Sequence, residues 1–333
     1  MVLREGSKGT DVLKLQKGLT ALGFPCGKFD SSFGPNVELA VARFQKAQNI
    51  LADGVAGPST LAHLNAALVA AKLDPALLFP VGLSSDVTPA PDDPAPTGPR
   101  LPWVVVPCDG YKDGFVEMSL RQDVANAWNA LLTDVHALGG ILTSAGGKRA
   151  LSSQAGAARS KASMHYVGRA FDLSLSSGMQ NPATDPFVVE RDPTGNGRKW
   201  DVWGRSKLIS TELGDKCRAL GIAGGRLTVD ATSCASKKGN GIVIRQTKTL
   251  FTGFSFTDLA AKHGFSRISG RPLFFTGESY DGAEWWHHQY TGDLVAGTTT
   301  FGGELLRVHS LEAARKFVYW DQVKNWKYAQ NWS

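Results

Sequence analysis

One stretch of the chain, residues 163–172, reads SMHYVGRAFD and places His165 seven residues before Asp172. From residue 168 onward small or polar side chains alternate with bulky ones, which is typical of a β-strand. On such a strand Asp172 shares a face with Gly168 and Ala170, whose small size leaves room for a metal ion and a substrate. His165 would then lie on the loop that leads into the strand. Taken alone, this spacing also fits an ordinary surface loop.

A second stretch, EWWH at residues 284–287, supplies the groups that a hydrolytic site still lacks. Catalytic zinc sites commonly use three protein ligands and keep one position open for water. With His165 and Asp172, His287 makes a set of two imidazoles and one carboxylate, so we expect one catalytic Zn²⁺. Glu284 is placed to act as the general base that takes a proton from the attacking water.

The three residues next to Glu284 and His287 leave alternative roles open. His288 could be the ligand in place of His287, because the two imidazoles are adjacent. Trp285 and Trp286 would wall the site and contact the substrate, or they would simply pack in the core, as aromatic side chains usually do.

The N-terminal segment predicts a small helical domain over residues 1–75. Apolar residues recur at helical spacing in three stretches, and the last two stretches each begin with Gly-Pro, at Gly34-Pro35 and Gly57-Pro58. Proline in the first turn of a helix costs no hydrogen bond, so the same loop-helix device is used twice.

A change of composition separates this domain from the rest. Residues 76–102 are rich in proline and small or acidic residues and contain few apolar side chains, so they predict a semi-extended linker. Beyond it, residues 103–333 predict one α+β domain with a mostly antiparallel sheet. We expect helices over 120–138, 206–220 and 257–262 and strands at 141–143, 227–229 and 242–244.

The composition narrows the classes of partner. The net charge is +6, which favours polyanionic partners such as nucleic acid or an anionic cell wall. No basic cluster is interleaved with aromatic residues, so we do not expect nucleic acid. No apolar run reaches the roughly 20 residues that span a bilayer, and we expect no stable membrane insertion. A C-terminal stretch around Phe317 and Trp320 predicts a helix docked on the core, with a membrane-active amphipathic helix as the alternative. Cys217 and Cys234 could form a disulfide or remain thiols. We expect a monomer.

The N-terminal segment resembles the peptidoglycan-binding domain of the three-helix type. The resemblance rests on Leu3-Arg4-x-Gly6-x-x-Gly9-x-x-Val12-x-x-Leu15-Gln16, Gly23-Phe24, Phe33-Gly34, Ala40-Val41-x-x-Phe44-Gln45 and Asp53-Gly54-Val55-x-Gly57-x-x-Thr60. It implies a non-catalytic module that holds an enzyme on the cell wall.

The two site stretches together resemble the zinc D-Ala-D-Ala carboxypeptidase family, which includes L-alanyl-D-glutamate endopeptidases. The shared pattern is Ser163-x-His165-x-x-Gly168-x-Ala170-x-Asp172 followed by Glu284-x-x-His287. The resemblance implies that His165, Asp172 and His287 bind zinc and that Glu284 is the catalytic base.

The same resemblance implies an upstream arginine that stabilises the transition state. Arg149 is the candidate, with Lys148 as the alternative, because a guanidinium offers a fixed fork of donors to an oxyanion. Gln154 and Ser163 are the further candidates for substrate binding, together with Trp285 and Trp286, although Ser163 also fits an ordinary turn.

One segment departs from the family pattern. Residues 174–255 are longer than a minimal member needs between its two motifs, and the pattern returns at Ala260-x-x-His263-Gly264-Phe265 and Arg271-Pro272. Such an insertion can shape the substrate cleft, so it leaves the cleaved bond open.

These observations predict a modular peptidoglycan hydrolase that cuts peptide bonds in stem peptides or cross-links, as an endolysin-like endopeptidase does. A D-Ala-D-Ala carboxypeptidase and a non-catalytic wall-binding protein with a vestigial zinc site are the alternatives. The protein would act in the cell wall or periplasm. The N-terminus shows no secretory signal, so we expect release through a phage holin, another export route, or a signal absent from this chain. Phage or bacterial origin stays open.

Overall fold

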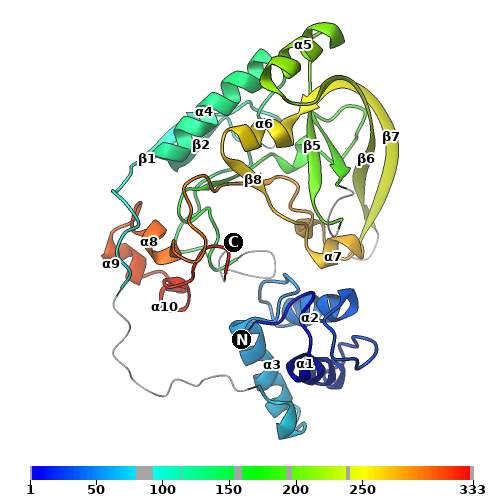
Figure 1. The fold of residues 1–333 in the computed structure, drawn as a ribbon, viewed down its shortest axis with the longest axis vertical. Helices are drawn as coiled ribbons and strands as arrows, with labels where there is room; N and C mark the ends of the chain where they lie inside the picture. The colour runs from blue at the N-terminus through cyan, green and yellow to red at the C-terminus, as the bar shows by residue number, and fades with distance from the viewer. Residues whose placement is uncertain are drawn as a thin grey trace. The chain divides into compact units, whose positions relative to one another are not determined.

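A computed structural model of the chain describes residues 2–79, 93–112, 114–153, 160–192, 197–237 and 241–330. These residues form two compact units (Figure 1). The first contains the N-terminal residues to position 79, Ser160 and Arg271–Ala283, and the second contains the remainder. The mixture of helices and mostly antiparallel strands confirms the predicted α+β class.

The N-terminal part of the first unit is built from three helices, as predicted. They are α1 (Thr10–Ala21), α2 (Pro35–Ala47) and α3 (Pro58–Ala70), followed by the 3₁₀ turn η1 (Pro75–Leu77). Both α2 and α3 begin with proline after a glycine in an extended conformation. The apolar faces of the helices meet in one core, which includes Leu15, Val41 and Leu64.

The internal repeat extends to a pair of buried glutamines. Gln16 Nε2 donates to Asp30 Oδ1 at 2.9 Å, and Gln45 Nε2 donates to Asp53 Oδ1 at 2.8 Å. Each glutamine is 1% exposed, and each amide oxygen accepts a backbone N–H of the loop that carries the aspartate. The two loops are therefore held by the same side-chain clamp.

The first unit also contains a segment from much later in the chain. Arg271–Ala283 carries the short helix α7 (Pro272–Phe275) and the 3₁₀ turn η3 (Tyr280–Gly282). Residues 80–92 of the expected linker lie outside the described residues, whereas Phe79 is buried in the helical core and Asp93 belongs to the second unit.

The second unit begins with a β-ribbon and a long helix. Strands β1 (Trp103–Pro107) and β2 (Glu117–Arg121) pair antiparallel, and α4 (Gln122–Ala137) follows directly. The predicted strand at 141–143 is wrong. Leu142 instead exchanges hydrogen bonds with the single residue Asp109, through its carbonyl and through its N–H, so no ladder forms there.

A three-stranded antiparallel sheet carries both site stretches. Its order is β3 (Ala170–Asp172), β9 (His287–Tyr290), β8 (Phe265–Arg267), so the strands farthest apart in sequence are neighbours. Helix α6 (Phe256–Lys262) precedes β8 and begins with a cap in which Ser255 Oγ accepts the N–H of Asp258.

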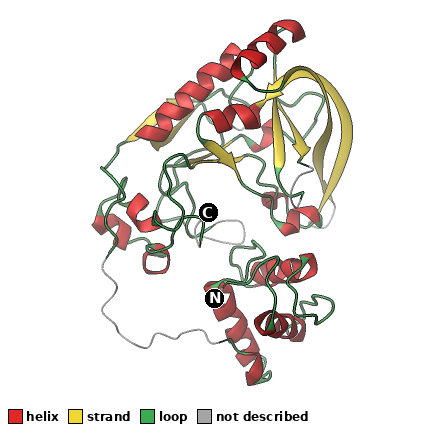
Figure 2. Ribbon diagram, viewed as in Figure 1, coloured by secondary structure: helices red, strands yellow, loops and turns green. Residues whose placement is uncertain are grey.

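The long segment between the two motifs folds into a closed barrel. Its strands β4 (Phe187–Arg191), β5 (Trp200–Arg205), β7 (Gly241–Ser255) and β6 (Gly224–Lys237) close in that order. Figure 2 shows β6 and β7 as long curved strands. They contain the predicted strands 227–229 and 242–244 and extend well beyond them. Helix α5 (Ser210–Leu220) precedes β6 and ends at Gly221, which adopts the left-handed conformation (φ 64°).

The C-terminal stretch packs on the segment that contains the first motif. Three short helices follow β9 in this region, namely α8 (Phe301–Leu305), α9 (Leu311–Arg315) and α10 (Trp320–Val323). The 3₁₀ turn η2 (Leu175–Ser177) lies earlier in the chain, after β3. Phe317 and Trp320 share a buried cluster with Tyr166 and Ala170. All four cysteines are free thiols. Among the described residues no helix is long and apolar enough to cross a bilayer.

Candidate metal centre

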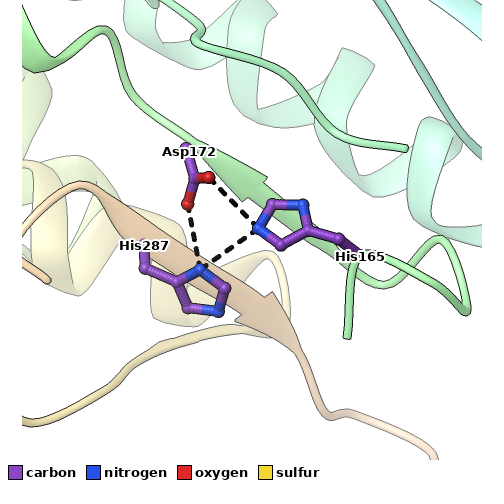
Figure 3. A group of neighbouring side chains, drawn as sticks. All are labelled: His165, Asp172 and His287. Carbon is purple, nitrogen blue, oxygen red and sulfur yellow. Dashed lines mark hydrogen bonds and ion pairs between the residues drawn. The ribbon is translucent and has the colours of Figure 1, made fainter. Parts of the chain in front are cut away.

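Two paired strands bring the residues of the two motifs together. In the antiparallel ladder of β3 and β9, Asp172 lies directly opposite His287. Oδ1 of Asp172 is 2.9 Å from Nδ1 of His287, and Oδ2 of Asp172 is 3.2 Å from Nε2 of His165 (Figure 3). The two facing imidazole nitrogens are 3.3 Å apart.

These separations fit a single metal ion. Donors about 2.0–2.2 Å from a tetrahedral ion lie about 3.4 Å from one another. The three observed separations, 2.9, 3.2 and 3.3 Å, are close to that value, and the two that involve Asp172 start from its two different carboxylate oxygens. One donor atom from each of His165, Asp172 and His287 lies within 4.8 Å of the other two, and we call this group the triangle. Two imidazoles and one carboxylate are a donor set that suits zinc.

The protein fixes the orientation and tautomer of His165. Its Nδ1 lies 2.5 Å from the carbonyl oxygen of Gly147, which can only accept a hydrogen bond. Nδ1 must therefore carry the proton in the neutral ring, which leaves the lone pair of Nε2 directed at Asp172 and His287. Such a partner behind a ligating imidazole is a regular feature of metal sites.

A glycine turn leads from His165 into β3. Gly168 has φ +70°, and a Cβ at this position would come within 3.0 Å of the backbone nitrogen of Arg121. The turn thus needs glycine both for its conformation and for space. It allows His165, 3% exposed, to return over the strand that carries Asp172.

The charges in the triangle depend on one another. Burial alone would raise the pKa of Asp172, but the charges and hydrogen bonds of His165 and His287 outweigh it and hold this pKa far below its usual range. Burial would lower the pKa of His287, and the carboxylate of Asp172 reverses the effect. The carboxylate is therefore ionised and available as a ligand.

His288 lies on the opposite face of β9 from His287. Its ring stacks on Phe171 with an interplanar angle of 6° and meets Phe256 edge-on. Its Nδ1 is 3.1 Å from the carbonyl oxygen of Trp286, and burial lowers its pKa to about 4. The structure therefore brings His287, and not His288, to the triangle.

Glu284 lies close to the triangle in a strained conformation. It is 6% exposed, and its charge contributes to raising the pKa of His287. Its φ of +58° is uncommon for a residue with a Cβ, and such strain tends to occur where a side chain must be aimed. Its carbonyl accepts the N–H of His287 at 3.2 Å, so a tight turn separates the two.

Arg149 and Ser163 form a polar pair beside His165. Nη1 of Arg149 donates to the Ser163 hydroxyl at 2.9 Å, and the backbone N–H of Arg149 donates to the His165 carbonyl. Ser163 is two residues before His165, and the charge of Arg149 opposes the rise in the pKa of His287 that Asp172 causes. Lys148 instead lies over the ring of Trp103 at 4.6 Å.

Of the remaining predicted site residues, Trp285 and Trp286 are buried, and Gln154 is not described. Trp285 and Trp286 are 1% and 7% exposed, and the Trp285 ring packs directly on Gly178. Their burial matches the core-packing alternative. Gln154 lies outside the described residues.

Sequence reasoning missed two parts of the surroundings. One is the Gly147 carbonyl, because a backbone acceptor leaves no signal in side-chain patterns. The other is a buried ion cluster behind β3, in which Arg121 and Arg169, both 0% exposed, donate to Glu304. A charged residue between the apolar neighbours Val167 and Phe171 was the available signal for Arg169.

Comparison with known proteins identifies the N-terminal region. Residues 8–64 match the peptidoglycan binding domain family. A probable N-acetylmuramoyl-L-alanine amidase of Bacillus licheniformis is 44% identical over 69 residues, 20% of this chain and 20% of that protein. The zinc D-Ala-D-Ala carboxypeptidase of Streptomyces albus G is 44% identical over 62 residues, 17% of this chain and 24% of that protein. No solved structure matches the chain.

These matches cover the N-terminal region, and the chain spans no more than about a quarter of either relative. The chain therefore carries a peptidoglycan-binding domain at its N-terminus, as its sequence pattern predicted.

Proposed function

We propose that the protein is a zinc-dependent peptidase that cleaves peptide bonds in the stem peptides or cross-links of peptidoglycan. The observation that carries the proposal is the triangle of His165, Asp172 and His287, whose donor separations match one tetrahedral ion. The N-terminal domain supports peptidoglycan as the substrate polymer.

When bound in this triangle, a zinc ion supplies Lewis-acid polarisation of the scissile carbonyl and lowers the pKa of water. Glu284, buried beside His287, takes the proton of the attacking water and passes it to the leaving amine. Arg149, held by Ser163, donates to the oxygen on which negative charge develops.

We propose a division of labour along the chain in which residues 1–75 bind the wall, 76–102 connect and 103–333 hydrolyse, as a monomer acting in the cell wall. Asp93 supports a connector that is fixed at its far end, because its carboxylate binds Arg315 at 2.6 Å and Lys324 at 3.2 Å. The segment Arg271–Ala283, grouped with the helices, is the exception to this simple order.

A non-catalytic protein with a retired metal site is the alternative from another class. Glu284 argues against it, because a protein that only binds has no need of a carboxylate held beside the metal ligands in a strained backbone conformation. Between an endopeptidase and a D-Ala-D-Ala carboxypeptidase, mass spectrometry of the muropeptides released from purified walls decides.

The Glu284→Ala variant tests the proposal directly. It should retain one zinc per chain and lose about 10²–10⁴-fold in wall hydrolysis, since it removes the proton acceptor and spares the ligands. Zinc content by atomic absorption and release of free amino groups from walls are the measurements. Glu312→Ala, an exposed glutamate outside the site, is the control. If the Glu284→Ala protein hydrolyses walls as fast as the parent, the proposed mechanism is wrong.

A further inference from the structure

The helical part of the first unit has a second buried patch outside its own core. Ala42 and Ala52 are 0% and 3% exposed, yet neither belongs to the cluster formed by the three helices. They form a separate cluster with Leu273, which is 3% exposed, and with the partly buried Leu39. The patch is therefore buried by the segment Arg271–Ala283.

Further contacts fix this segment on α2 and on the loop after it. A Cβ at Gly54 would lie 3.2 Å from Cγ of Pro272, so the proline ring packs against that backbone. Nη2 of Arg43 is 2.6 Å from Oε1 of Glu278, and Nε donates to the same oxygen at 3.0 Å. Because Arg43 is 45% exposed, this ion pair adds specificity more than stability.

The segment is itself a closed loop. The N–H of Arg271 donates to the Gly282 carbonyl at 2.7 Å, which ties its two ends together. Within it, Glu278 N–H donates to Leu273 at 2.9 Å and Ala283 N–H donates to Tyr280 at 2.8 Å. The loop is therefore closed by its own backbone hydrogen bonds, and Leu273 is its apolar anchor.

The loop ends at the residue before Glu284. Ala283 is 0% exposed, and Glu284 follows with φ +58°. A non-glycine residue in this region costs on the order of 1–3 kcal/mol and persists only where its surroundings hold it. The anchored loop therefore holds the residue on one side of Glu284, while the buried Trp285 follows on the other.

We propose that the peptidoglycan-binding helices also position the catalytic base, because they anchor the loop that delivers Glu284. The inference rests on the proposed function of Glu284. It makes Ala42 and Leu273 positioning residues, although neither contacts the substrate or the metal ligands. The binding domain then contributes to the geometry of the active site, in addition to binding the wall.

The test introduces a charge into the anchor and spares the helical core. Ala42→Asp buries a carboxylate against Leu273, whereas Ala66→Asp puts the same change on an exposed position of α3 and is the control. The substrate is a mixture of soluble muropeptides released by a muramidase, so that wall binding does not limit the rate. We measure kcat, KM, zinc content and wall cosedimentation.

We expect Ala42→Asp to lose about tenfold or more in kcat, since a small misplacement of a catalytic group can cost up to about 10²-fold. Zinc content, KM and wall cosedimentation should match those of Ala66→Asp. Leu273→Ala attacks the same contact from the loop and decides the question if Ala42→Asp does not fold. A kcat equal to that of the control in the folded variant overturns the proposal.

Amide hydrogen exchange separates this inference from the proposed function. In Ala42→Asp the amides of Glu278, Ala283 and His287 should exchange about tenfold faster or more, while that of Leu173, which donates to the Trp286 carbonyl, should not change. If the parent hydrolyses no muropeptide, the proposed function fails, and exchange still decides whether the helices hold the loop. Unchanged exchange at Ala283 and His287 overturns the positioning role.

Discussion

His287 and His288 are chemically identical neighbours with opposite surroundings. Successive side chains on β9 point to opposite faces, so His287 meets Asp172 and His288 lies between Phe171 and Phe256. Among the described residues, His288 Nε2 is one of three buried side-chain polar atoms without a hydrogen-bond partner. Strand alternation thus assigns one imidazole to the metal triangle and the other to the core.

This difference predicts divergent effects of substitution. His287→Ala should weaken zinc binding by at least about 10²-fold, because even partners behind a ligand cost 10–100-fold when lost. His288→Phe should keep the parent's zinc affinity, since its ring has an aromatic environment and its Nε2 has no partner to lose. Competition with a chromophoric chelator measures both. Equal losses in the two variants would contradict the assignment.

At the scale of elements, a buried ion cluster connects the residue before β3 to helix α8. Glu304, at the fourth position of α8, accepts hydrogen bonds from Arg121 at 2.6 Å and Arg169 at 3.0 Å. Burial lowers the pKa of Arg169 to about 10, although the charge of Glu304 opposes this effect. Since Arg169 lies between His165 and Asp172 in sequence, the cluster supports the strand that carries the candidate ligand.

Removing Glu304 should therefore be costly. Glu304→Ala leaves two fully buried guanidinium groups without their shared partner, and breaking a buried ion pair from one side costs about 3–5 kcal/mol. Glu312→Ala, which loses an exposed pair with Lys316, should change stability by no more than about 0.5 kcal/mol. Urea denaturation compares the two. A loss below about 1 kcal/mol for Glu304→Ala would show that the cluster does not support the fold.

Element prediction from sequence succeeded where one residue pattern decides the outcome. Pro35 and Pro58 fix the starts of α2 and α3, because the proline ring restricts φ and needs no hydrogen bond there. Gly221 marks the end of α5, because glycine can adopt the left-handed conformation that ends a helix. It failed at Ile141–Thr143, whose apolar residues fit a strand. There the side chain of Asp109 competes with a strand ladder for the Leu142 N–H, and no local pattern reveals that partner.

At the scale of the whole molecule, zinc bound by His165, Asp172 and His287 should raise the free energy of unfolding. Binding to the native state at about 100 times Kd adds about 2.7 kcal/mol, which raises the melting temperature by several degrees in a chain of this size. Differential scanning fluorimetry with zinc added to metal-free protein measures the shift. His165→Ala should show little shift, and magnesium should be ineffective because it prefers oxygen ligands. A full zinc shift in His165→Ala would place the ion elsewhere.

The sequence by itself determined the class of fold, the three-helix peptidoglycan-binding domain and the residue types of the candidate metal site. Helical periodicity, Gly-Pro pairs and short motifs are local, so they can be read without the fold. Only the tertiary structure decided that Asp172 faces His287 across two strands, that Gly147 orients His165, and that the 174–255 insertion closes a barrel. It also placed Leu273 on Ala42 and Ala52, because packing joins surfaces that no sequence spacing connects.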